Sequence, residues 1–397
     1  MCIISDGGSH MENYYDKMEK TLVNKNISYM NLDKESSFKI GESNELIGTF
    51  CSKLENVKKD EKIYTTIELF AGAGGLALGV EKAGFDTIGL IEIDKDASDS
   101  LKENRPNWNV INEDIANISC LNLEDYFNIG KGQLDLLSGG APCQAFSYAG
   151  KRLGLEDARG TLFYHYATFL QKLQPKMFLF ENVRGLLTHD KGRTYETITD
   201  IFKQAGYTIQ KKILNAWNFG VPQKRERLII IGIRTDLVDK VVFNFPKEHK
   251  YKPVLRDILL DCPKGPGVLY GENKRKIFDL VPPGGYWKDI DPEIAKEYMK
   301  SCWNMQGGRT GILRRMSLDE PSLTVLTSPS QKQTERCHPL ETRPFTVREN
   351  ARCQTFPDDW KFCGSVQSQY KQVGNAVPVN LAYEIALEIY KSLRGVE

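Results

Sequence analysis

Cys143 is the side chain in this sequence whose setting best suits nucleophilic chemistry. It follows an apolar run, Leu134–Ser138, and then the segment Gly139-Gly140-Ala141-Pro142. A lone cysteine is usually a small buried apolar residue. Here, however, the cysteine comes after the carboxyl end of a predicted parallel strand, where ligand crevices form in open α/β sheets. Nearby basic groups would favour the reactive thiolate, so the pattern indicates covalent chemistry at this position.

A glycine-rich turn, residues 68–75, links the first predicted strand to a helix. Glycines let the backbone approach a ligand closely and expose amide groups at the start of the helix. Glu92 follows the second strand and could accept hydrogen bonds from ribose hydroxyls. Asp114 follows the third strand and is placed to meet an adenine amino group. The glycine spacing differs from the GxGxxG of dinucleotide sites, which disfavours a dehydrogenase, whereas S-adenosylmethionine has no pyrophosphate that requires it. A tight turn that simply needs small residues is the alternative.

Taken together, Gly-Ala-Pro-Cys-Gln-Ala-Phe-Ser (140–147) and Phe-Ala-Gly-Ala-Gly-Gly (70–75) resemble the DNA cytosine-5 methyltransferases. The resemblance covers residues 65–235 and 343–392 in the order of that family's motifs. The further matching segments are Glu181-Asn182-Val183, Gln223-Lys224-Arg225-Glu226-Arg227, the run 343–359 and Gln372-Val373-Gly374-Asn375-Ala376-Val377-Pro378.

The resemblance implies a role for each catalytic residue. Cytosine C5 is a poor nucleophile, so Cys143 would first add to C6 and turn C5 into an enamine carbon. Glu181 would protonate or hydrogen-bond N3, and Arg227 would hold O2, supported by Arg225. C5 would then take the methyl group, a water-mediated base would remove the C5 proton, and expulsion of the cysteine would regenerate the enzyme. In the alternative interpretation, Glu181 caps a helix and the two arginines are surface charges.

The same resemblance gives a set of residues for S-adenosylmethionine, whose product is S-adenosylhomocysteine. We expect contacts from the glycine turn, from the ends of the second and third strands and from the last motif: Phe70, Ala71, Gly72, Gly74, Gly75, Leu76, Glu92, Ile93, Asp114, Ile115, Pro142, Leu162, Asn375, Ala376 and Val377.

The apolar periodicity predicts a parallel sheet with helices on both faces, that is, an α/β fold with a Rossmann-like methyltransferase sheet. Strands are expected near 63–70, 87–92, 108–112, 134–138, 176–180, 207–214 and 227–233, and helices at 75–84, 96–104, 161–173 and 193–205. Further helical patterns cover 346–354 and 376–392. We divide the chain into a tag remnant and polar extension (1–62), a catalytic and cofactor-binding domain (63–248), a smaller loop-rich target-recognition domain (249–345) and a segment that completes the catalytic domain (346–397).

Double-stranded DNA is the expected partner. Residues 247–352 hold 19 lysines and arginines against 14 aspartates and glutamates, although the whole chain carries a net charge of only +1. Because a target base inside a duplex is inaccessible, it must be flipped out, and residues 143–160 are expected to form a loop that closes over it. The residues expected to contact DNA are Gln144, Ser147, Lys151, Arg152, Arg309, Arg314, Arg315, Lys332 and Arg336. The run 328–339 resembles the recognition region of family members that read GGNCC or GGWCC.

Composition narrows the remaining possibilities. Nine scattered cysteines without a CxxC pair favour reduced thiols, and Cys337-His338 lacks the paired spacing of a zinc site, so we expect no metal. The longest apolar run, Leu228–Ile233, is too short to cross a bilayer, so we expect no membrane partner. We predict a cytoplasmic, nucleoid-associated bacterial enzyme that is monomeric on DNA and protects host DNA in a restriction–modification system. The alternatives are a tRNA-type RNA cytosine-C5 methyltransferase, which would have a smaller target domain, and a non-catalytic DNA-binding regulator.

Overall fold

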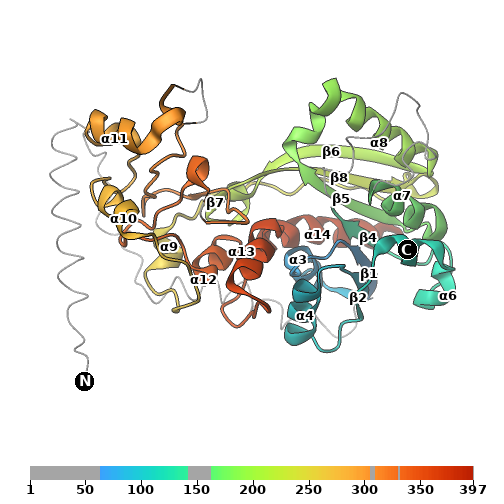
Figure 1. Ribbon diagram of the computed structural model, residues 1–397. Coiled ribbons are helices and arrows are strands. Elements are labelled where there is room, and N and C mark those ends of the chain that lie inside the picture. Colours follow the sequence, from blue (N-terminus) through green and yellow to red (C-terminus); the bar gives the residue numbers. More distant parts are fainter. Residues whose placement is uncertain (1–62, 142–161, 305–308, 330, 397) are drawn as a thin grey trace. The chain divides into compact units, whose positions relative to one another are not determined.

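The computed structural model describes residues 63–141, 162–304, 309–329 and 331–396 (Figure 1). The chain divides into two units, Met1–Val57 and Lys58–Glu397, and all described residues lie in the second. The predicted extension (1–62) and the predicted closing loop, with Pro142, Cys143, Gln144, Ser147, Lys151 and Arg152, lie outside the described residues.

A seven-stranded sheet forms the centre of this unit, in the order β3-β2-β1-β4-β5-β8-β6. Its strands are β1 (Tyr64–Leu69), β2 (Phe85–Ile91), β3 (Val110–Ile111), β4 (Leu136–Gly139), β5 (Met177–Val183), β6 (Tyr207–Asn215) and β8 (Glu226–Arg234). The α/β class is confirmed, but the expectation of an all-parallel sheet is wrong, because β8 runs antiparallel to both β5 and β6. The connection from β6 to β8 contains no crossover helix, and a parallel return would need one.

Helices pack on both faces of the sheet. They are α3 (Gly75–Lys82), α4 (Lys95–Asn104), α5 (Ile115–Cys120), α6 (Leu123–Phe127), α7 (Leu162–Leu173), α8 (Arg193–Gln204) and α14 (Val379–Leu393). The central strands β5 and β8 are apolar on both sides, as expected for strands covered twice. Phe178 and Phe180 join the core with α5, α7 and α8, whereas Met177 and Leu179 join the core with α3 and α14. Figure 1 shows α14 lying across the sheet beside α3.

The remaining α-helices follow β8. They are α9 (Arg256–Leu259), α10 (Glu272–Phe278), α11 (Pro292–Met299), α12 (Val347–Cys353) and α13 (Val366–Asn375). A two-stranded sheet pairs β7 (Gln223–Lys224), just before β8, with β9 (Ser322–Leu323). Residues 270–337 contain a separate apolar core around Phe278, Met299 and Leu313. Sequence patterning missed α13 and began the last helix at residue 376, three residues early. The domain boundaries at 249 and 345 stay predictions.

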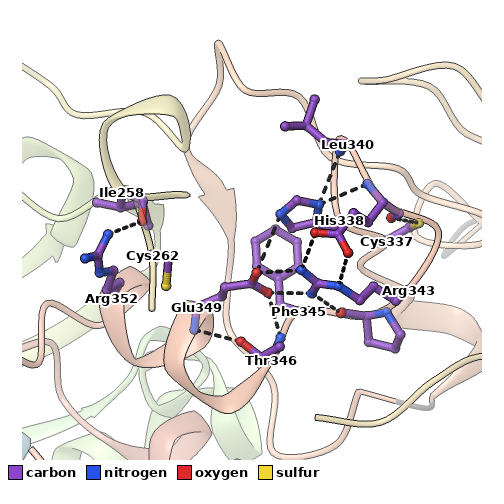
Figure 2. A network of polar contacts seen from close by, with 12 residues as sticks. Ile258, Cys262, Cys337, His338, Leu340, Arg343, Phe345, Thr346, Glu349 and Arg352 are labelled. Carbon is purple, nitrogen blue, oxygen red and sulfur yellow. Dashed lines mark hydrogen bonds and ion pairs between the residues drawn. The ribbon is translucent and has the colours of Figure 1, made fainter. Parts of the chain in front are cut away.

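A buried polar network lies where the predicted target-recognition segment meets α12 (Figure 2). Arg343 and His338 both point toward the carboxylate of Glu349, and Arg343 donates to each of its oxygens at 2.8 Å. His338 Nδ1 accepts from the amides of Leu340 and Glu341 at 3.2 and 3.1 Å, and Nε2 lies 3.6 Å from Glu349 Oε1. This network fixes the entry into α12, where Glu349 also completes the capping box with Thr346.

The buried imidazole makes the stability of this junction depend on pH. Burial lowers the pKa of His338 to about 4; the carboxylates of Glu349 and Glu341 oppose this shift, whereas the charges of Arg343 and Arg315 add to it. The unfolded chain therefore takes up a proton near pH 6.5, which the folded state does not accept until about pH 4. The contribution of His338 to the free energy of unfolding is therefore present above pH 6.5 and is lost as the pH falls from 6.5 to about 4.

Replacing this histidine should make unfolding less sensitive to acid. We expect the difference in unfolding free energy between wild type and His338→Gln to shrink as the pH falls from 7 towards 4, because glutamine keeps an acceptor but does not titrate. Thermal unfolding midpoints measured at closely spaced pH values test this. Two curves that stay parallel across this range would contradict it.

Candidate active site

The turn after β1 has positive φ angles that few residue types adopt. Phe70 has φ 60°, and Gly72 and Gly74 have φ 55° and 87°. A left-handed, non-glycine residue is strained and is held here by its surroundings: the amide of Ala71 donates to Ile91 O at 3.1 Å, and that of Gly74 donates to Ala71 O at 3.0 Å. The turn is therefore fixed against the end of β2.

Glu92 closes this turn from the neighbouring strand. Its carboxylate accepts from the amide of Gly72 at 2.7 Å through Oε2 and from that of Asp94 at 2.8 Å through Oε1. Burial raises the pKa of Glu92, and these two amide donors oppose the rise. Next to it, Ile93 is 65% exposed, although it is a large apolar residue. A Cβ added at Gly72 would meet no atom within 4 Å, so there is open space beside a carboxylate and an uncovered apolar side chain.

Asp114 lies at the start of α5 and caps that helix through a 2.8 Å bond from the Ala116 amide. The sequence predicts that this carboxylate also accepts from an adenine amino group. Ile115 lies in the same apolar core as Phe70 and Leu162, which pack against its edge. The structure thus brings three of the expected cofactor residues onto one face of the sheet.

The last motif returns to the glycine turn. A Cβ at Gly75 would lie 2.2 Å from Val377 O and 3.2 Å from Ala376 Cβ, so a larger residue could not be accommodated there. One turn further along α3, Gly79 permits a similar approach by Ala382 of α14. The predicted contribution of residues 375–377 to the cofactor site is therefore consistent with direct packing on the turn.

Glu181, the predicted proton donor, and Arg227, predicted to bind the target cytosine, form an ion pair. Arg227 Nε lies 2.7 Å from Glu181 Oε1, with the two side chains 13% and 15% exposed. They come from the paired strands β8 and β5, near the end where β4 also finishes. A Cβ at Gly140 would lie 2.7 Å from Glu181 Oε2, so the backbone three residues before Cys143 lies against this carboxylate.

Asn182 belongs to one of the matching motifs but has no predicted role, and it holds Ala141 in place. Its Nδ2 donates to Ala141 O at 2.9 Å, two residues before Cys143, and its Oδ1 accepts from the Val183 amide. An amide side chain at the end of an apolar strand, next to the predicted acid, was the signal that could have identified it.

Arg225 lies in a different place from Arg227. It is buried and donates through Nη2 to the carbonyls of Gly374 and Ala376, at 3.1 and 2.9 Å. Burial lowers its pKa to about 9, with the charge of Arg227 acting in the same direction. These contacts make Arg225 a link between β8 and the last motif, so its supporting role would be one of positioning.

Two buried glutamines extend this link, and sequence reasoning missed both. Gln223 accepts from the Val325 amide at 2.8 Å and donates to Gln354 Oε1 at 2.9 Å. Gln354 donates in turn to Val373 O and Ala376 O at 2.8 and 3.1 Å. Buried polar groups must be paired, so this network joins the β7 region to α12 and to the end of α13.

The cations expected to contact DNA have different surroundings. Arg315 is buried and donates to Phe278 O at 2.7 Å, which is a structural position. Lys332 donates to Tyr298 O at 2.6 Å, and Arg309 lies over the Trp287 ring. Arg314 and Arg336 are partly buried. Within the described ranges, no group of three or more metal-ligating side chains occurs and no helix is long and apolar enough to span a membrane.

Comparison with known proteins agrees with this geometry. A family model described as C-5 cytosine-specific DNA methylase matches residues 64–391. Type II methyltransferase M.Sau96I of Staphylococcus aureus is 56% identical over 331 residues, which cover 83% of this chain and 76% of that protein. Type II methyltransferase M.Eco47II of Escherichia coli is 49% identical over 343 residues, which cover 84% of this chain and 81% of that protein.

Solved structures share the fold at lower identity. A DNMT2 variant from Spodoptera frugiperda superposes with a TM-score of 0.58 at 18% identity, covering 82% of this chain and 99% of that one. The Dnmt2 methyltransferase of S. pombe gives a TM-score of 0.52 at 20% identity, covering 83% and 99%.

The contact between Gly75 and Val377 predicts the effect of one added methyl group. Gly75→Ala should destabilise the protein by about 1–3 kcal/mol and weaken binding of the methyl donor, because the obstructing atom belongs to the backbone. Denaturant unfolding and titration calorimetry measure the two effects. Gly271→Ala is the matched control, since its Cβ would enter open space. Equal stability and donor affinity in the two variants would contradict the prediction.

Proposed function

Given that this chain belongs to the C-5 cytosine-specific DNA methylase family and methylates cytosine at C5 in DNA, we propose that Cys143, Glu181 and Arg227 carry out the reaction. The observation that supports this most directly is the ion pair between Glu181 and Arg227 beneath the loop that leads to the cysteine. The bond from Asn182 to Ala141 O anchors that loop on the same strand as Glu181.

The thiolate of Cys143 forms a bond to C6 of the flipped cytosine. The C5–C6 π electrons move to the C4–C5 bond, and the C4–N3 π electrons move to N3, where Glu181 supplies a proton or a hydrogen bond. Arg227 holds Glu181 in place and donates to the base O2. After C5 has gained its methyl group, a water-mediated base removes the C5 proton, and the returning electrons expel the thiolate from C6.

S-adenosylmethionine is the proposed methyl donor, and when bound it supplies a sulfonium methyl group to C5. The open space at Gly72, the carboxylate of Glu92 and the exposed Ile93 suit the amino-acid, ribose and adenine parts of such a ligand. Asp114 would accept from the adenine amino group, and residues 375–377 would complete the wall.

Residues 249–345 are proposed to read the target sequence, with GGNCC or GGWCC as the candidate sites. The relatives are named Type II methyltransferases, in keeping with a restriction–modification enzyme. We propose that the protein lies with the bacterial chromosome in the cytoplasm and is monomeric on DNA. The separate apolar core within 270–337 supports a DNA substrate over a tRNA substrate, for which a smaller target segment was expected.

The substrate and the modified position can be tested together. We expect plasmid DNA from cells that express the protein to carry 5-methylcytosine at one short sequence, found by bisulfite sequencing. Cells that express Cys143→Ala serve as the control and should show none. Methylation of RNA instead of plasmid DNA would overturn the proposed substrate.

The covalent step has a direct test. An oligonucleotide with 5-fluorocytosine at the target position should remain attached to the protein when the methyl donor is present, because a C5 that carries fluorine has no proton to lose. Denaturing electrophoresis detects the adduct, and Cys143→Ala should form none while still binding DNA. Turnover of this variant at the wild-type rate would refute the assignment of the nucleophile.

Loss of the acid should affect chemistry and spare binding. Glu181→Gln should lower kcat by about 10²–10⁴-fold with little change in DNA affinity, since the amide cannot donate a proton to N3 in the same way. Single-turnover methylation separates the two quantities. Glu226→Gln is the matched control, because Glu226, at the start of the neighbouring strand β8, is exposed and forms a surface pair with Arg184. The assignment fails if both variants methylate at the same rate.

A further inference from the structure

Two extended segments of the predicted target-recognition region lie side by side. Arg315 pairs with Cys337 in a parallel bridge, with the Met316 amide donating to Cys337 O at 3.0 Å and the Cys337 amide donating to Arg314 O at 2.9 Å. Both paired side chains are buried. Since side chains alternate along an extended segment, Arg314 and Arg336 lie next to each other on the opposite face.

This places two like charges together, which by itself is destabilising. Burial lowers the pKa of Arg336 to about 10, and the charge of Arg314 adds to the effect. The Nε atoms of both arginines are buried and have no hydrogen-bond partner in the described part of the chain. Arg336 donates from Nη1 to the adjoining Glu335 carbonyl at 2.9 Å, and the guanidinium carbon of Arg314 lies 5.5 Å from the centroid of the Tyr286 ring.

The carboxylate of the adjoining residue, Glu335, is engaged by other groups. Glu335 is fully buried; it forms an ion pair with Lys274 and accepts from the Tyr298 hydroxyl and the Leu313 amide, each at 2.6 Å. Leu313 has φ 48°, a strained conformation that this bond helps to hold. The carboxylate of Glu335 thus fixes Leu313, the residue before Arg314, and Glu335 itself directly precedes Arg336.

We propose that Arg314 and Arg336 together read a guanine of the target sequence by donating to its O6 and N7 acceptors in the major groove, with Glu335 as the positioning residue. This inference rests on the proposed DNA-methylating function of the site. Guanine presents two adjacent acceptors that match the planar guanidinium. One guanidinium lies over the Tyr286 ring and the other is partly buried beside it, so the freedom of both side chains is restricted, as base readout requires. Phosphate anchoring by a mobile surface cation does not require this.

The first experiment uses the wild-type protein and the sequence that bisulfite mapping identifies. Each guanine of that sequence is replaced in turn by 7-deazaguanine, which lacks N7. At one guanine we expect about a 10- to 100-fold loss of affinity. If none of the replacements weakens binding, the proposal is overturned, whatever the behaviour of any variant. If the wild type methylates no DNA, the proposed function fails first.

The second experiment assigns that guanine to the pair. Arg314→Lys and Arg336→Lys keep the positive charge but lose the paired N–H donors of the planar guanidinium. We therefore expect each variant to lose most of the discrimination at that guanine. Affinity for unrelated DNA should stay close to the wild-type value. Lys276→Ala, an exposed cation paired with Glu272 on α10, is the control and should discriminate as the wild type does. Glu335→Gln should weaken discrimination with an unchanged kcat at saturating DNA.

A phosphate contact would give a different result. In that case, the lysine variants would keep the wild-type preference at every guanine, and the corresponding alanine variants would lose affinity for all sequences alike, with a smaller salt dependence. That outcome overturns the proposal while leaving cytosine methylation, and hence the proposed function, intact.

Discussion

The approach of the segment after α13 to the glycine turn after β1 is the contact on which the rest of this structure depends. Gly75 leaves room for Val377 O, and Arg225 and Gln354 bind the carbonyl of Ala376 from the other side. Parts of the chain separated by some 300 residues therefore build one wall. Gly75 is required because a side chain would collide with Val377 O, and Arg225 is required because the buried carbonyl of Ala376 must be satisfied.

The reversed direction of β8 gives the catalytic pair its geometry. An antiparallel partner of β5 brings Arg227, at the start of its strand, beside Glu181, near the end of the other. A parallel strand in this place would present its opposite end at this edge of the sheet. The same edge receives Gly140 and Ala141 from β4, so the carboxylate, the guanidinium and the loop toward Cys143 converge without a long connection.

Apolar patterns and motifs predicted those features that depend on residues close together in the sequence. Apolar runs located all seven main strands, and the motifs located Glu181, Glu92 and the glycine turn. The apolar run of β8 reads the same in either direction and so did not predict how the strand runs. The short connection from β6, which has no crossover helix, was the signal for an antiparallel strand. The sequence predicts a supporting role for Arg225 but gives no sign that three backbone carbonyls surround its charge. Helix α13 was missed because Gln, Ser and Gly weaken its apolar stripe. Roles at residues 142–161 stay predictions.

The position of α14 has a consequence for synthesis on the ribosome. Leu381, Ile385 and Ile389 of this helix cover the sheet face that Leu179 and Ile231 also line. Every strand of the sheet leaves the ribosome before this helix does. One side of the nascent sheet therefore stays bare of its cover, exposing apolar surface of the kind that chaperones recognise, until residues 379–393 have been translated.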